Sequence, residues 1–277
     1  AETVHTLNLK RYQALAKLKP LTEPQLQQAV RDVTRATAKP GDAEPVNTAT
    51  APADSDHIQH RFTLATAPGI EIQAEFYRPA DGKHKALLIL KDSLDAALEP
   101  SRGEEIRRFR ALADAGTAVL VIAPRPSPPG VEETKSPILG PFYMSELRAE
   151  LVGRTLLGLR VDDVISAVNF MSHGTTVDPD QIAGQASGHL GLVLLHAAVL
   201  DPRLKHVTID HTLESYDSLL KETMPLDVPQ DILPGVVRRY DIPDLVRALG
   251  PRLTFNNPLS GTADLSGLDN PNGQASQ

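Results

Sequence analysis

The chain has 277 residues, with 28 basic and 35 acidic side chains and a formal net charge of −7. An acidic balance disfavours nucleic acid and membrane surfaces as partners, because both select basic patches. Cysteine is absent, which excludes disulfides, a thiolate nucleophile and cysteine-ligated metals. No apolar run approaches the roughly 18 residues of a membrane span. No H-E-x-x-H or phosphate-loop spacing occurs either, so we predict neither a metal site nor a cofactor.

The first 56 residues are predicted to form a helical N-terminal extension and a linker. Leucines at helical spacing predict a helix over 6–19, which Pro20 ends. Thr22-Glu23-Pro24 is typical of a second helix start. Residues 39–56 are mainly Pro, Ala, Thr and Asp, which indicates a linker. No charged segment followed by an apolar one suggests a signal peptide.

From residue 57 onward, strands alternate with helices. An antiparallel pair is expected at 60–66 and 70–77, around Pro68-Gly69. The pattern then predicts strands at 86–90, 117–123, 181–184, 206–210 and 252–256, and helices at 104–115, 152–171, 190–200 and 242–249. This order predicts an α/β domain over 57–277, with a mostly parallel sheet and helices on both faces.

The most informative stretch is 177–201, which reads as strand, glycine turn and buried helix. This is the arrangement around a G-x-S-x-G nucleophile, whose small flanking residues permit a strained turn. Gly184 and Gly188 stand at the flanking positions, and the residue between them is Ala186. A frame centred on Ser187 is flanked by the bulkier Gln185 and His189. The steric pattern therefore favours Ala186 at the apex, where a methyl group cannot attack an acyl carbon.

Residues 60–260 resemble α/β-hydrolases of the acetyl-xylan-esterase and dipeptidyl-peptidase-like type. The resemblance rests on motifs that occur in the expected order: Lys85–Leu90, Ala123-Pro124-Arg125, Gly158–Asp163, Val177-Asp178-Pro179, Ala197–Arg203 and Tyr240–Leu245. It implies a carboxylic ester hydrolase fold of bacterial type that acts on small esters or carbohydrates. It also favours a secreted or periplasmic location.

The departures from that family predict a pseudoenzyme. The family's general-base histidine follows the last strand, but no histidine occurs after Arg252. Asp264 is a candidate for the acidic member, and the final strand and helix are expected to be missing. An oxyanion hole is expected to survive, formed by the Ser187 N–H and the 92–94 loop. The pocket residues expected around it are Ser93, Leu94, Arg125, Gly184, Gly188, Ser215 and Tyr216.

Other interpretations stay open at this point. Ser187 could be an active nucleophile assisted by His189 or His211, or a residue that caps the following helix. A partner domain or a second copy of the chain could complete the sheet. Asp162-Asp163 is expected to be a solvated face or a helix–loop ion pair. His196 is expected to be a satisfied core histidine.

Overall fold

The computed structural model describes residues 2–15, 20–41, 47–49, 58–79, 82–95, 101–126, 139–222 and 228–260. Within these residues eight strands form one sheet, in the order β1-β2-β3-β5-β4-β6-β7-β8. The first three strands and the β3–β5 pair are antiparallel, and the remaining pairs are parallel. The strands are β1 (Asn47–Ala49), β2 (Ile58–Ala67), β3 (Ile70–Arg78), β4 (His84–Leu90), β5 (Thr117–Ala123), β6 (Val177–Ser187), β7 (Leu204–Asp210) and β8 (Leu253–Asn256).

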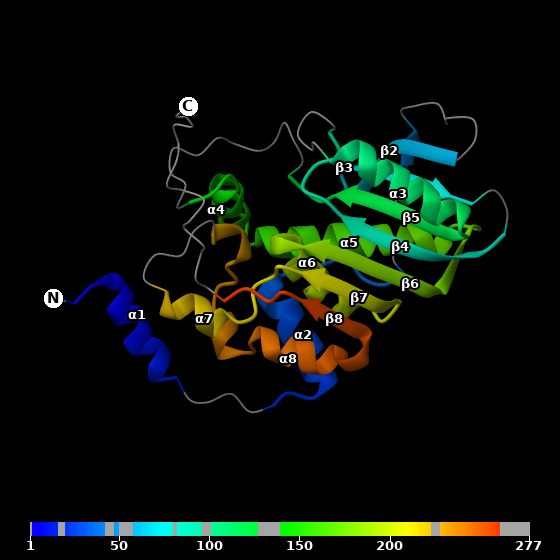
Figure 1. Ribbon diagram of the computed structural model, residues 1–277. Helices are drawn as coiled ribbons and strands as arrows, with labels where there is room; N and C mark the ends of the chain where they lie inside the picture. The colour runs from blue at the N-terminus through cyan, green and yellow to red at the C-terminus, as the bar shows by residue number, and fades with distance from the viewer. Residues whose placement is uncertain are drawn as a thin grey trace, which may run out of the picture.

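Helices cover both faces of this sheet, as Figure 1 shows. Alternate residues of β4 and β5 face opposite sides, so each strand contributes to two apolar clusters. One cluster packs against α3, and the other packs against α2, α5, α6 and α8. The helices are α1 (Val4–Gln13), α2 (Glu23–Thr34), α3 (Arg102–Asp114), α4 (Tyr143–Leu151), α5 (Leu156–His173), α6 (Gly188–Leu200), α7 (Tyr216–Lys221) and α8 (Ile242–Leu249), with 3₁₀ turns η1 (Pro229–Asp231), η2 (Val236–Arg238) and η3 (Gly250–Arg252).

The predicted α/β class with a mostly parallel sheet is confirmed, and several elements differ in extent. β5 and α8 have the expected bounds, because each has a strong local pattern and clear ends. The helix expected at 152–171 is α5, which begins four residues later at Leu156, because a turn at Gly153 with φ 75° follows α4. The strand expected at 181–184 extends over 177–187. This difference in β6 moves the start of the following helix.

Helix α2 of the N-terminal segment packs into the core of the domain. Leu26, Val30 and Val33 are buried in the larger apolar cluster, and α2 contacts α6. The helix start at Thr22-Glu23-Pro24 is as expected, with Thr22 as N-cap. Three residues of the expected linker form β1, which pairs with β2. The domain boundary at 56/57 stays a prediction.

Candidate functional site

The sharp bend between β6 and α6 lies at Gly188. Ala186 is inside the strand, paired with Ile209 of β7, and Ser187 pairs with Asp210. Ser187 has extended backbone angles, whereas Gly188 has φ +57° and is the first residue of α6. The prediction that Ala186 occupies the apex is therefore wrong. It rested on Gly184 and Gly188 as the small flanking residues of the turn, but β6 continues three residues past Gly184.

Gly188 occupies the position that carries the serine in a nucleophile elbow. That serine sits on a strained strand-to-helix turn, and a left-handed φ is the strain in question. A glycine adopts this φ without cost and carries no side chain. The backbone N–H that follows the bend belongs to His189, not to Ser187 as expected. The bend therefore keeps its backbone geometry and offers no oxygen or sulfur nucleophile of its own.

Gly184 is buried in β6, where it faces helix α6. A Cβ built on it would lie 2.9 Å from Cδ1 of Leu194 on α6. A methyl group at that distance overlaps its neighbour, so glycine lets α6 lie close against β6. The expectation that Gly184 marks the bend is corrected to this helix–sheet contact.

Ser187 is exposed at the carboxyl end of β6. Its hydroxyl makes no hydrogen bond to any described residue, and it does not cap α6. Ser187 is the N-cap residue of α6, at the helix start that was expected, but its hydroxyl does not make the expected capping hydrogen bond. Its hydroxyl is open to solvent beside the bend.

His189, in the first turn of α6, is held by a carboxylate. Its Nδ1 lies 2.6 Å from Oδ2 of Asp231, and 37% of the His189 side chain is exposed. Asp231 ends the η1 turn, which packs among α4, α5 and α6. The turn is fixed from behind, since Arg160 Nη1 donates to Oε1 of Gln230 at 2.8 Å. A carboxylate on Nδ1 orients an imidazole with Nε2 outward, as in a catalytic triad.

A second histidine–carboxylate pair follows β7, the neighbouring parallel strand. Nδ1 of His211 lies 3.0 Å from Oδ2 of Asp210, and Asn257 Nδ2 donates to Oδ1 of Asp210 at 2.9 Å. These contacts, with Asn257 first, hold the pKa of Asp210 below its usual value. Because β6 and β7 are adjacent and parallel, both histidines and Ser187 lie at one sheet edge.

Ser93 and Leu94 follow β4, the other neighbour of β6, and both are buried. Ser93 Oγ accepts from the N–H of Asp95 at 3.0 Å, and the Leu94 carbonyl accepts from Arg61 Nη2 at 3.1 Å. Arg61 itself pairs with the fully buried Glu75. These contacts fix the loop beside the bend, which is where the second oxyanion donor of this fold arises.

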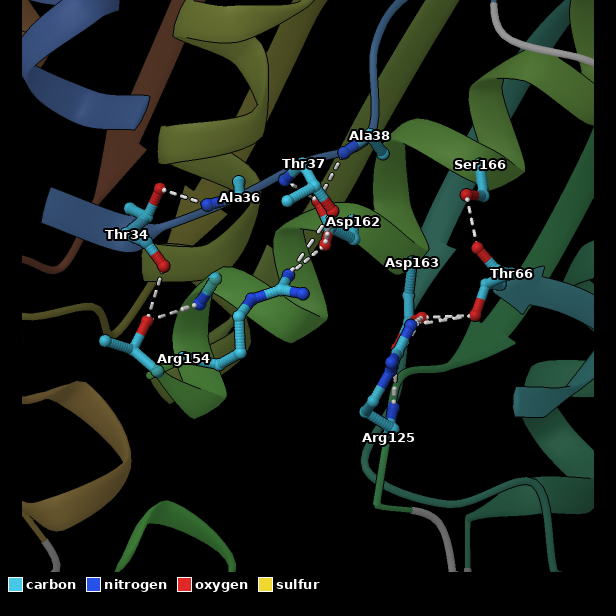
Figure 2. Close-up of polar contacts among 12 residues, drawn as sticks. Thr34, Ala36, Thr37, Ala38, Thr66, Arg125, Arg154, Asp162, Asp163 and Ser166 are labelled. Atoms are coloured by element: carbon cyan, nitrogen blue, oxygen red, sulfur yellow. Dashed lines mark hydrogen bonds and ion pairs between the residues drawn. The ribbon is translucent and has the colours of Figure 1, made fainter. Parts of the chain in front are cut away.

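Arg125 is bound to Asp163 of α5. Figure 2 shows its guanidinium and backbone N–H directed at the Asp163 carboxylate, which Thr66 Oγ1 also contacts at 2.6 Å. Asp162, the residue before Asp163, accepts from the N–H groups of Thr37 and Ala38 at 2.7 and 2.8 Å. The helix–loop ion pair is confirmed, and the solvated face is wrong, because both carboxylates are buried.

Ser215 and Tyr216 lie at the start of α7. Ser215 accepts from the N–H of Asp217 as the helix N-cap and donates to Asp241 at 2.6 Å. Tyr216 is 3% exposed and lines a cavity beside α1. Its buried hydroxyl has no hydrogen-bond partner among the described residues. Asp264 lies outside the described residues.

His196 on α6 is a core histidine, as expected. Its Nδ1 lies 2.7 Å from the Leu192 carbonyl and its Nε2 3.1 Å from the Tyr240 hydroxyl. Complete burial lowers the pKa of His196 to about 4. Across the part of the chain that the structure describes, no three His, Asp or Glu side chains are grouped to hold a metal. No helix there is long and apolar enough to cross a membrane.

Neither a family model nor a curated protein matches this sequence. Solved structures do match. A Bacteroides fragilis protein assigned as an acetyl xylan esterase is 13% identical over 92% of this chain and 76% of its own, with a TM-score of 0.73. A CE15 esterase from a marine bacterial metagenome is 13% identical, over 92% and 83%, with a TM-score of 0.58. The Solibacter usitatus glucuronoyl esterase is 13% identical, over 84% and 72%, with a TM-score of 0.57.

These similar structures are described as acetyl xylan, CE15 and glucuronoyl esterases, and each matches most of this chain in fold. At this identity the likeness concerns the fold alone. The chain has the α/β-hydrolase fold of these carbohydrate esterases.

Proposed function

We propose that this protein binds an ester or acylated carbohydrate at the β6–α6 bend without turning it over through a serine nucleophile. The observation that carries the proposal is Gly188 at the position of positive φ. Removal of the nucleophile alone costs an enzyme of this kind about 10⁶ in kcat. Backbone N–H groups at such a bend still bind a carbonyl oxygen, because they need no side chain.

The surrounding contacts support binding at this edge. The His189 N–H follows the bend, the loop carrying Ser93 and Leu94 is fixed beside it, and two imidazoles lie at the same edge. Imidazole and backbone N–H groups donate to the carbonyl and hydroxyl oxygens of an acylated sugar. Completion of the β8 edge by a partner domain or a second copy remains a prediction.

A second candidate is an ester hydrolase that uses Ser187. The specific observation is that Ser187 has an unengaged, exposed hydroxyl beside two histidines, each oriented by a carboxylate. His211 has no partner for Nε2 among the described residues, as a general base requires. Against this candidate, neither imidazole is hydrogen-bonded to the Ser187 hydroxyl, and Ser187 lies one residue before the bend.

The experiment that separates the two candidates is hydrolysis of p-nitrophenyl acetate by the wild type, Ser187→Ala and His211→Asn. We expect equal, weak turnover from all three, because no nucleophile sits at the bend. Titration with acetylated and deacetylated xylo-oligosaccharides, followed by NMR, should show saturable binding of the acetylated form.

A loss of 10³-fold or more in Ser187→Ala would establish the hydrolase and overturn the binding proposal. Absence of saturable binding by either oligosaccharide would overturn the ligand class. Leu151→Trp, an exposed change on α4, serves as the matched control in both assays because Leu151 is 78% exposed.

A further inference from the structure

Helix α4 is short, and glycines with left-handed backbone angles stand on either side of it. Gly140 has φ 70° and Gly153 has φ 75°. The helix packs against α5 and the η1 turn, and Figure 1 shows it beyond one end of α5. At its C-terminal end, Leu151 and Val152 are 78% and 74% exposed. A short helix between two such turns can move as a unit, because glycine absorbs the change in backbone angles.

The inner side of α4 carries a buried carboxyl group, Glu146, which is 6% exposed. Its Oε2 accepts from the N–H of Leu156, the first residue of α5, at 2.6 Å. Its Oε1 is buried and has no hydrogen-bond partner among the described residues. A carboxylate loses far more solvation on burial than a neutral carboxyl group does. The contact between α4 and α5 therefore suits the protonated form of Glu146.

The charged groups around Glu146 do not offset its burial. Arg160 of α5 and Arg35 at the end of α2 favour the carboxylate, whereas Glu150, one turn further along α4, opposes it. Burial is the largest influence and raises the pKa of Glu146 to about 7. A change in pH near neutrality therefore adds or removes a charge inside the contact between α4 and α5.

The η1 turn, which packs against α4, carries the carboxylate that orients His189. Asp231 is the only titratable residue of this turn, and its Oδ2 lies 2.6 Å from Nδ1 of His189. The neighbouring Gln230 is 2% exposed and accepts from Arg160 at 2.8 Å. The Arg160 guanidinium also lies 4.5 Å from the centre of the Phe142 ring, at the start of α4. One arginine thus joins α4, α5 and η1, so a movement of α4 reaches the His189–Asp231 pair.

We propose that Glu146 is a pH-sensitive latch for α4: when it loses its proton, α4 moves away from α5, the η1 turn loosens, and Asp231 no longer fixes His189. The movement brings Oε1 of the carboxylate into contact with water, which supplies the missing hydrogen bonds. This inference rests on the proposed function in that His189 lies where the ligand binds. Acidic pH then favours the arrangement that binds ligand, and pH above neutrality weakens it.

The test is hydrogen–deuterium exchange of the ligand-free wild type, Glu146→Gln and Glu150→Gln at about pH 5.5 and 8. Protection factors remove the intrinsic effect of pH on exchange, and α8 serves as the internal reference. We expect protection of α4 and η1 in the wild type to fall about 20-fold from the lower to the higher pH, because opening returns the carboxyl group from its raised pKa to the ordinary 4.5.

The two variants separate the latch from a general effect of pH. Glu146→Gln should stay protected at both pH values, since glutamine keeps an acceptor for the Leu156 N–H and does not ionise. Glu150→Gln removes an exposed carboxylate from the same helix and should behave as the wild type. If Glu146→Gln does not fold, the wild-type profile decides: protection should fall between about pH 4.5 and 7 and level off above 7.

Binding of an acetylated xylo-oligosaccharide at the same pH values adds the functional readout. The wild type should bind several-fold more weakly than Glu146→Gln at pH 8 and equally well at pH 5.5. Titration of His189 and His211 cancels in this ratio, because both proteins contain these residues.

Three outcomes of the exchange experiment would overturn the proposal. They are constant protection in the wild type, an equal fall in Glu146→Gln, and a fall confined to α4 while η1 stays protected. A wild-type profile with a different pH range would do the same. Absence of oligosaccharide binding at both pH values would contradict the proposed function instead, and the exchange result, obtained without ligand, would still decide on the latch.

Discussion

Two pairs of carboxylates in this molecule differ in the groups that they bind. Asp162 and Asp163 on α5 are buried, and each accepts from backbone N–H groups and a guanidinium (Figure 2). Asp210 ends β7, and Asp231, itself buried, ends the η1 turn; each contacts the imidazole of a partly exposed histidine. Asp162 and Asp163 hold neighbouring segments against the core. Their hydrogen-bond partners occupy the carboxylate oxygens, so these do not serve a ligand. The second set orients side chains toward solvent, which is what a binding site needs.

The largest effect should come from breaking the buried set. Asp163→Asn removes the charge that Arg125 and the Thr66 hydroxyl depend on, and leaves Arg125 85% buried without its partner. We expect a loss of about 3 kcal/mol in the free energy of unfolding, measured by urea denaturation. The control is Asp180→Asn, in an exposed pair with Lys205 at 3.6 Å, which should cost less than about 0.5 kcal/mol.

Glu146 is an intermediate case: a buried carboxyl with one backbone partner. It is 6% exposed, its Oε2 accepts from the Leu156 N–H at 2.6 Å, and its Oε1 has no partner among the described residues. Burial outweighs that hydrogen bond and the nearby Arg160, and raises the pKa of Glu146 to about 7. The folded state therefore holds the proton more tightly than the unfolded state does.

The sign of the pH effect follows from that raised pKa. Stability from Glu146 is fully present below about pH 4.5 and is lost as pH rises toward 7. Relative to Glu146→Gln, the wild type should lose about 2 kcal/mol of unfolding free energy between pH 4.5 and 8. A flat difference would contradict it. His196 contributes with the opposite sign at low pH and cancels in this comparison.

Gly188→Ala isolates the backbone at the bend. A Cβ at this residue meets no atom within 4 Å, so the only cost is the left-handed φ of 57°. We expect a loss of about 1 kcal/mol in thermal or urea unfolding. Gly191→Ala is the contrast, because its Cβ would lie 1.9 Å from Oγ1 of Thr212 and should cost more. A loss in Gly188→Ala as large as that in Gly191→Ala would contradict this account, because the left-handed φ alone would not explain it.

The smallest effect should come from the exposed pair at the edge. His211→Asn removes the contact with Asp210 while keeping a residue that tolerates the positive φ of 46°. Because the His211 side chain is 58% exposed, the change should alter stability by less than about 0.5 kcal/mol. A loss near that of Asp163→Asn would erase the distinction between the two sets.

The sequence predicted most of the fold and less of the site. Buried strands such as β5 and the capped helix α8 carry complete local signals, and their bounds were as expected. The end of β6 has no local sequence signal. Gln185 to Ser187 are held in the strand by pairing with β7, which is a contact across the sheet. Gly188, the first residue of α6, is the local signal for the bend, because glycine tolerates a positive φ. The G-x-S-x-G frame centred on Ala186 uses Gly188 only as a flanking residue.

Other site features depend on packing that spacing cannot reveal. The pairing of His189 with Asp231 joins residues 42 positions apart, and the unpartnered hydroxyl of Tyr216 is defined by what surrounds it. Asp162 and Asp163 read as a polar face of a helix, and only the path of Thr37 and Ala38 across α5 buries the first of them. Long-range contacts decided each of these.

The measurement that tests the central claim most directly is intact-mass spectrometry after exposure to a fluorophosphonate, with a serine esterase as the positive control. A bend that carries Gly188 has no activated serine, so the account predicts an unmodified chain while the control enzyme is fully labelled. A stoichiometric adduct, mapped by peptide sequencing to Ser187 and absent from Ser187→Ala, would contradict it.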